Sequence, residues 1–186
     1  ARVGDERRIA ALDRAAQLFA LRLALITPFV LALWWLSMPA YAWLVGQVAA
    51  LLLKVAGGYP IEHVVVKAVG FLNTDTTLGF DLGDRTPTTP VSWVVTNVAV
   101  YVALVLATRR IDWKQRLRAL AIGAAVLAAT HVTHIVVFFH FAKAIARDPQ
   151  IPTAIAQIFI TLPFLLLIVL AYLRADAGPE VASTRR

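Results

Sequence analysis

The chain contains no cysteine. Disulfide bridges, thiolate nucleophiles, iron–sulfur clusters and cysteine-based zinc sites are therefore excluded. Acidic residues are also few, because aspartate and glutamate together number 11, and none of them lies in the long apolar stretches. With neither internal repeats nor a charged pathway through those stretches, the sequence offers little from which to build a transporter.

Apolar residues instead make up 60% of the 186 residues, and the mean hydropathy is +0.73. A soluble domain usually has about 45–50% apolar residues, so the composition predicts a single membrane domain. The net charge of +7 does not indicate nucleic-acid binding, because the basic residues gather at the ends of apolar stretches and form no patch with interleaved aromatics. We expect contacts with the lipid bilayer and no nucleic-acid partner.

Lysine and arginine residues gather at alternate ends of four apolar stretches. Of the 18, thirteen lie before the first stretch, between the second and third, or after the fourth, and five lie elsewhere. Because cytoplasmic loops carry the excess of basic residues, this split predicts a multi-pass protein of the bacterial inner membrane with both termini in the cytoplasm. The expected topology anchors of the middle loop are Arg109, Arg110, Trp113, Lys114, Arg116 and Arg118.

The predicted fold class is an all-α polytopic membrane protein with four transmembrane helices. The apolar stretch from Leu23 to Ala56 exceeds the ~20 residues that one span needs. Pro39 is expected to divide it, because an interior proline removes a helix hydrogen bond. An interfacial helix would follow at 43–56, with the rings of Trp34, Trp35, Tyr41 and Trp43 near the interface. The four spans are expected at about 22–42, 91–108, 117–141 and 151–173.

The expected organisation has three parts. Residues 1–22 form a cytoplasmic amphipathic segment, 23–174 the four-helix membrane domain, and 175–186 a disordered cytoplasmic tail. The basic N-terminus resembles a secretory signal, but its acidic residues and the length of the apolar run favour a retained first span. Pro163 is expected to kink the fourth span.

An extracytoplasmic insertion at 57–90 interrupts the apolar pattern. Residues 61–69 are rich in β-branched side chains, and residues 76–82 alternate polar and apolar side chains as a returning strand does. The turn is expected at Asn73-Thr74-Asp75, and 84–90 form a connector. Because a lone β-hairpin is marginally stable in water, we expect it to pack on the 43–56 helix, on helix ends or on a partner.

Polar side chains lie in the second and third spans. His131, Thr133 and His134 lie in the outer half of the third span, and His140 lies near its end. His131 and His134 share a helix face, which is compatible with a purely structural role, a proton relay, or ligation of haem or chlorin. No second ligand pair supports a cofactor, and none is predicted.

The start of the second span carries Ser92, Thr96 and Asn97. Thr96 and Asn97 are expected to join the histidines of the third span through interhelical hydrogen bonds. Ser92 with His134 is an alternative nucleophile and base. A calcium site at Asp75, Asp81 and Asp84 is disfavoured, because their spacing does not match an EF-hand loop, and no metal site is predicted.

In its size, four expected spans, short extracytoplasmic segment and layout from residue 91 onward, the sequence resembles the exosortase and archaeosortase family of membrane transpeptidases. In that family a cysteine near the outer start of one span attacks the sorting signal, and an arginine and a histidine assist. Here residues 90–93 occupy the place of the cysteine motif, 130–135 that of the arginine motif, and 146–152 that of the histidine loop. None of the three catalytic residues is present, so the resemblance implies a degenerate exosortase-like scaffold without transpeptidase chemistry.

The leading hypothesis is a non-enzymatic accessory subunit of a larger inner-membrane complex, of respiratory, photosynthetic or export type. The alternatives are an exosortase-like sorting factor or membrane enzyme, and a haem- or chlorin-binding subunit. Small residues let membrane helices approach closely, so the third span is expected to pack against other integral membrane subunits through its small-residue face. The hairpin and the 43–56 helix are expected to supply further partner contacts. The expected partner-binding residues are Asn73, Thr74, Asp75, Phe80, Gly123 and Ala124.

Overall fold

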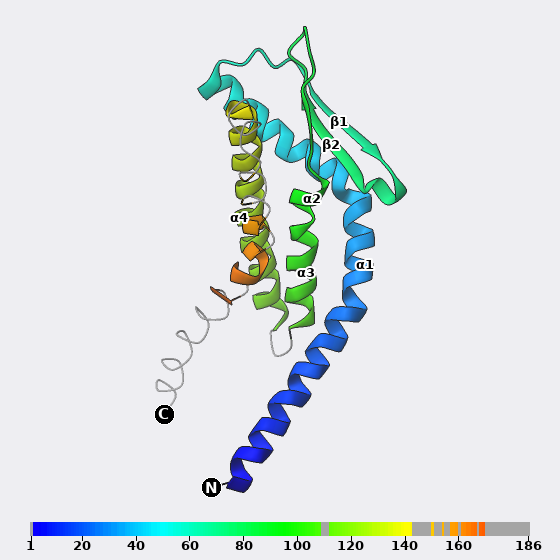
Figure 1. Cartoon of the computed structure of the whole chain (residues 1–186), viewed down its shortest axis with the longest axis vertical. Coiled ribbons are helices and arrows are strands. Elements are labelled where there is room, and N and C mark those ends of the chain that lie inside the picture. The colour runs from blue at the N-terminus through cyan, green and yellow to red at the C-terminus, as the bar shows by residue number, and fades with distance from the viewer. Residues whose placement is uncertain are drawn as a thin grey trace.

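The computed structural model describes residues 2–108, 112–142, 150, 154, 157–159, 161–166 and 168–169, with backbone alone at 2–13, 15 and 93. The described part is mostly helical, with four helices and one three-stranded antiparallel sheet (Figure 1). The elements are α1 (Arg2–Gly57), β1 (Val64–Val69), the 3-10 turn η1 (Phe71–Asn73), β2 (Asp75–Phe80), β3 (Thr88–Pro90), α2 (Ser92–Val95), α3 (Asn97–Ala107) and α4 (Trp113–His140).

Helix α1 continues through both Pro28 and Pro39, so the predicted division at Pro39 is wrong. Proline lacks the N–H that would bond the carbonyl four residues earlier, which for Pro39 is that of Trp35. The side-chain amide of Asn73 donates to this carbonyl instead, at 3.3 Å. The expected interfacial helix at 43–56 is the last part of α1, which runs at an angle to the earlier part and beneath the sheet (Figure 1).

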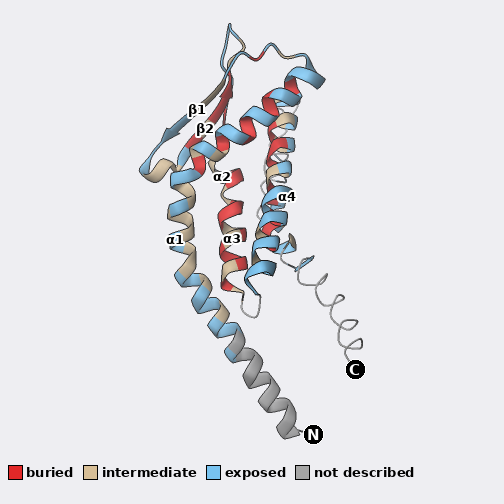
Figure 2. Cartoon of the chain, turned by 180° about the vertical axis from the view of Figure 1, so that it is seen from behind, coloured by how far each residue is buried: buried red, intermediate tan, exposed pale blue. Residues whose placement is uncertain are grey.

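The two halves of α1 differ in burial (Figure 2). Between Arg14 and Ser37 none of the described side chains is buried. From Met38 onward one face packs into the core at helical spacing, through Met38, Ala42, Val45, Ala49, Ala50 and Leu53. Gly46 lies where the sheet crosses, and a Cβ there would approach Leu78 Cδ1 to 2.7 Å. Glycine therefore allows the sheet to rest on α1.

The sheet confirms the predicted hairpin and extends it. Strands β1 and β2 pair antiparallel, with Val66 opposite Leu78. The connection between them begins at Gly70, with φ of 84°, and continues through η1. Strand β3 pairs with β2 inside the segment predicted as a connector. This short edge strand was missed because its threonines and Pro90 read as turn residues, although an edge strand tolerates proline.

Two of the four expected spans are long apolar helices in the described part of the chain. By length and composition Ala16–Gly57 and α4 are able to cross a membrane. The second expected span is divided into α2 and the short apolar helix α3. In the expected fourth span, 157–159 and 161–166 are helical. The rest of that span lies largely outside the described residues, as does the tail at 175–186.

Helices α3 and α4 pack through a tyrosine and a glycine. Tyr101 of α3 is fully buried, and its hydroxyl donates to the carbonyl of Ala119 in α4 at 2.7 Å. A Cβ at Gly123 would lie 2.1 Å from the Tyr101 ring. The small residue expected to contact a partner therefore accommodates a side chain of the same protein.

Candidate functional site

A polar network joins α1, α3 and α4 inside the apolar core. His131 of α4 is 0% exposed and Asn97 of α3 is 7% exposed. The Tyr41 hydroxyl of α1 lies 2.7 Å from His131 Nδ1, and Asn97 Oδ1 lies 2.9 Å from His131 Nε2. The expected interhelical bond to a histidine is confirmed for Asn97, whereas Tyr41 had been assigned only to the membrane interface.

The hydrogen bonds assign the proton on the His131 ring. Asn97 Nδ2 donates to the backbone carbonyl of Phe159 at 3.3 Å, and a carbonyl only accepts. The amide oxygen of Asn97 therefore faces His131, so Nε2 carries the proton and donates. His131 Nδ1 then accepts from the Tyr41 hydroxyl, and the neutral ring is fully satisfied.

Asn97 also compensates for a proline. Phe159 lies four residues before Pro163, which has no N–H to bond the Phe159 carbonyl. Asn97 fills that role from α3, as Asn73 does for the carbonyl that precedes Pro39. The carbonyls four residues before Pro39 and Pro163 therefore each accept from an asparagine far away in the sequence.

Aromatic rings enclose the network. The Phe159 ring stacks on His131 at 5.6 Å and 23°, and it meets His134 edge-on at 5.1 Å. Trp34 packs against Tyr41 with ring centroids 5.0 Å apart. Because both nitrogens of His131 already have partners within the chain, the ring offers no lone pair to a haem or chlorin metal. This geometry favours the structural role over cofactor ligation for His131, and the relay stays a prediction.

The hydroxyl groups near the histidines bond mostly within their own helices. Thr96 Oγ1 donates to the Ser92 carbonyl, and Thr133 Oγ1 donates to the Ala129 carbonyl at 2.9 Å. Such bonds to the carbonyl four residues earlier are typical of threonine in helices. The expected hydrogen bond from Thr96 to a histidine of the third span is therefore not formed. The pairing of Ser92 with His134 as nucleophile and base stays a prediction.

The structure divides the predicted partner-binding residues into internal and accessible ones. Phe80 is 1% exposed and its ring packs on Phe139 at 4.6 Å, so we place it in the core and not on a partner surface. Gly123 is likewise covered by Tyr101. Asp75 and Ala124 are exposed, and Asn73 and Thr74 are half-buried.

Four of the six residues predicted as topology anchors lie in the first turns of α4. The Asp112 carboxylate caps the helix by accepting from Gln115 N at 2.7 Å, and Arg116 Nη2 donates to the Thr108 carbonyl at 3.0 Å. Trp113, Lys114 and Arg118 are exposed, as an anchoring role requires. Arg109 and Arg110 lie outside the described residues.

Asp75, Asp81 and Asp84 all lie in the described segment between α1 and α2. Among the described residues no group of three or more histidines and carboxylates is placed to hold a metal ion. Asp81 Oδ1 instead accepts from Gly83 N at 3.0 Å and stabilises a turn.

Comparison of this chain with protein-family models, with curated proteins and with solved structures gave no match.

Proposed function

We propose that this chain is an integral protein of the bacterial inner membrane and acts as a non-enzymatic accessory subunit of a larger complex. The proposal is supported first by α1. Its exposed apolar side chains include Leu25 at 60%, Phe29 at 79% and Leu33 at 69%. Such a surface is costly in water, and it suits lipid tails or the helices of other subunits.

The observation that carries the subunit proposal is the tip of the β1–β2 hairpin. Phe71 is 81% exposed and the neighbouring Val69 is 64% exposed. The tip is held in place, because Asn73 donates to the Trp35 carbonyl and its own carbonyl accepts from Thr76 Oγ1 at 2.8 Å. An exposed aromatic side chain on a fixed turn is a good anchor for a partner.

The buried network supports the non-enzymatic part of the proposal. Catalytic side chains must present a reactive atom to substrate, whereas the ring nitrogens of His131 and the amide of Asn97 are engaged with one another, Tyr41 and Phe159. The arrangement of these side chains supports a role in fixing the positions of α1, α3 and α4 relative to one another. A purified chain that performs a defined reaction lost in His134→Ala, with assembly retained, would favour the enzyme alternative.

Phe71→Asp is expected to remove the partner while leaving the chain inserted. The introduced carboxylate would have to be desolvated in an apolar interface, whereas it stays hydrated on a free chain. Affinity purification from native membranes in mild detergent, followed by quantitative mass spectrometry, measures what co-purifies in fixed ratio. We expect at least a tenfold loss of the partner, since 1.4 kcal/mol corresponds to about tenfold in affinity.

Thr86→Asp is the matched control, because Thr86 is exposed in the same outer segment but lies away from the hairpin tip. It is expected to retain the partner. A wild-type chain that purifies alone as a single species would overturn the subunit proposal. Full retention of the partner by Phe71→Asp would remove the hairpin tip from the interface.

The absence of cysteine makes the proposed topology directly measurable. Thr86→Cys, in the outer segment, and Gln115→Cys, at the start of α4, are both exposed positions. We expect a membrane-impermeant maleimide to label Thr86→Cys on intact spheroplasts and Gln115→Cys only after the membrane is opened. The reverse pattern would invert the topology, and labelling of both on intact spheroplasts would contradict a membrane-crossing α4.

A further inference from the structure

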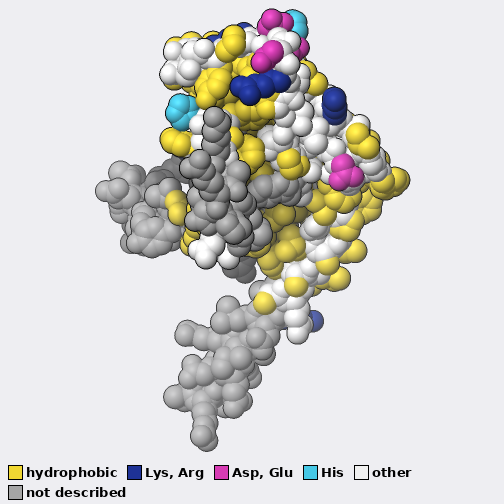
Figure 3. Space-filling model, turned by 45° about the horizontal axis from the view of Figure 1, so that its top comes forward, with side chains coloured by type: hydrophobic (Ala, Val, Ile, Leu, Met, Phe, Trp, Pro, Cys, Tyr) yellow, Lys and Arg dark blue, Asp and Glu magenta, His cyan; other side chains and the backbone are white. Residues whose placement is uncertain are grey.

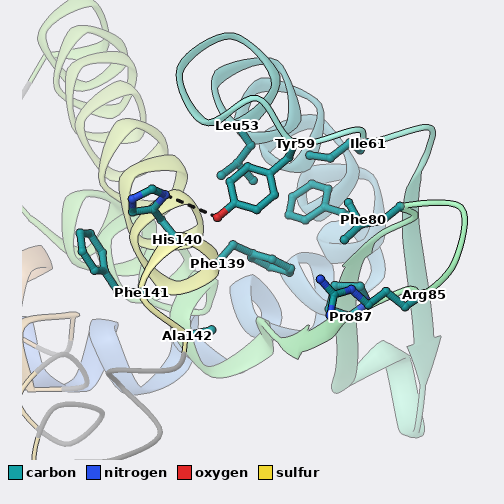
Figure 4. Close-up of a pocket in the computed structure, with 11 residues that line it drawn as sticks. Leu53, Tyr59, Ile61, Phe80, Arg85, Pro87, Phe139, His140, Phe141 and Ala142 are labelled. Carbon is teal, nitrogen blue, oxygen red and sulfur yellow. Dashed lines mark hydrogen bonds between the residues drawn. The ribbon is translucent and has the colours of Figure 1, made fainter.

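A cavity of about 630 Å³ opens between the sheet and the C-terminal ends of α1 and α4 (Figure 4). Its walls are mainly apolar and aromatic, with Leu53, Phe80 and Phe139 among them. The Tyr59 hydroxyl and His140 Nδ1 point toward each other across one side, 3.5 Å apart. The volume lies within the range of about 300–1,000 Å³ that is typical of ligand sites.

Among the described residues that line this apolar cavity, Arg85 is the one with a permanent positive charge. Its side chain is exposed and directed toward the cavity (Figure 4). No ion pair with another described residue neutralises it. On the space-filling surface, a basic side chain crosses a hydrophobic patch at this end of the molecule, with acidic side chains beside it (Figure 3). An apolar cavity with one cation at its mouth complements an amphiphile that has an anionic head.

The position of the cavity along α4 matches the headgroup level. Helix α4 has 28 residues and is therefore about 42 Å long. This length is close to the ~40–45 Å of a bilayer including its headgroups. Lys114 and Arg118 lie at the start of the helix, whereas His140 and Phe141 at its other end line the cavity.

We propose that this cavity binds an acyl chain of an anionic phospholipid from the surrounding bilayer, with the lipid phosphate bound by Arg85. The inference rests on the proposed membrane placement. An acyl chain is favoured over an extended peptide, because an acyl chain has no backbone polar groups to satisfy against apolar walls. The His140 ring and the Tyr59 hydroxyl add hydrogen-bonding groups at the edge of the headgroup region.

Photolabelling of the full chain in nanodiscs tests this site. The probe is phosphatidylglycerol carrying a diazirine near the end of one acyl chain, diluted into phosphatidylcholine, and the labelled residues are mapped by mass spectrometry. We expect labels on the cavity residues Tyr59, Phe80 and Phe139. Phosphatidylcholine with the same diazirine is expected to label them several-fold less.

Arg85→Gln is expected to lower cavity labelling by about fivefold, since one basic residue at an anionic lipid surface contributes about 1 kcal/mol. Lys67→Gln is the control, because it removes the same charge from an exposed position on β1 that does not line the cavity. Ala142→Trp, at the cavity wall, should block labelling without loss of charge, while Ala129→Trp on the exposed face of α4 should not.

Labels confined to the exposed faces of α1 and α4 would overturn the proposal. Equal labelling by the two lipids, or an unchanged cavity label in Arg85→Gln, would also overturn it, as would a cavity occupied by a co-purifying polypeptide that excludes the lipid. The maleimide experiment separates this failure from a failure of the proposed membrane placement. A chain with the expected topology but an unlabelled cavity refutes the lipid site alone.

Discussion

Asn97→Leu is expected to destabilise the chain by about 1–4 kcal/mol, because it removes two interhelical bonds of about 0.6–2 kcal/mol each. Leucine has nearly the same shape but neither donates nor accepts. His131 Nε2–H would lose its acceptor, and the Phe159 carbonyl would lose the donor that replaces the N–H missing at Pro163. Both groups would then be buried without partners.

Thermal unfolding in one detergent, followed by size-exclusion chromatography of the soluble fraction, measures this effect. Tyr41→Phe removes a single bond to His131 and should give a smaller loss of about 0.6–2 kcal/mol. Thr133→Val is the control, since Thr133 is exposed and bonds only within its own helix. If Asn97→Leu unfolds at the wild-type temperature, the network does not contribute to stability as described.

The sequence predicts that a polar network lies among the apolar helices, but it does not predict all the residues that form it. Asn97 and His131 are strongly polar residues in apolar spans, and desolvation requires that such groups find partners. Their bond was therefore predictable. Tyr41 was missed because tyrosine also suits the membrane interface, and nothing local distinguishes the two roles. A tyrosine hydroxyl inside an apolar stretch requires a hydrogen-bond partner when it is buried, but the sequence does not say which residue provides it.

The same limit applies to the proline-associated carbonyls. A proline inside a helix leaves the carbonyl four residues earlier without its backbone donor, and the side-chain amide of asparagine is able to donate to that carbonyl. The pairs Asn73–Trp35 and Asn97–Phe159 are 38 and 62 residues apart in sequence, however, and no periodicity links such distant positions. This is why Pro39 was expected to divide an apolar stretch that in fact forms one continuous helix.

Burial in the segment at 57–90 shows which features can be predicted from local sequence. The alternation in 76–82 predicts strand β2 with little error, because period-two patterning is a local property. It does not reveal that Phe80 packs on Phe139, because an apolar strand face fits equally well on the same chain or on a partner. Phe80 is buried and Phe71 is exposed because of tertiary packing, which the local pattern does not encode.

Gly123→Ala is expected to destabilise the chain even though alanine is the better helix former. Alanine gains about 0.8–1 kcal/mol in intrinsic helix propensity over glycine. The added Cβ would lie 2.1–2.3 Å from three atoms of Tyr101, and overpacking of a core costs about 1–3 kcal/mol, occasionally more. Tyr101 cannot move aside freely, because its hydroxyl donates to the Ala119 carbonyl. Because the contacts are this short, we expect the overpacking cost to lie at the upper end of that range, which gives a net loss of about 2 kcal/mol.

Ala124→Val is the matched control, because Ala124 is the exposed neighbour on the same helix. It should leave the unfolding temperature of the isolated chain nearly unchanged, since surface substitutions usually act within about 0.5 kcal/mol. Combining Gly123→Ala with Tyr101→Leu should recover part of the loss, because residues in contact couple. A Gly123→Ala chain more stable than wild type would mean that the Tyr101 ring does not occupy this site. Reduced partner recovery in Ala124→Val with unchanged stability would assign the internal contact to Gly123 and the intermolecular contact to Ala124.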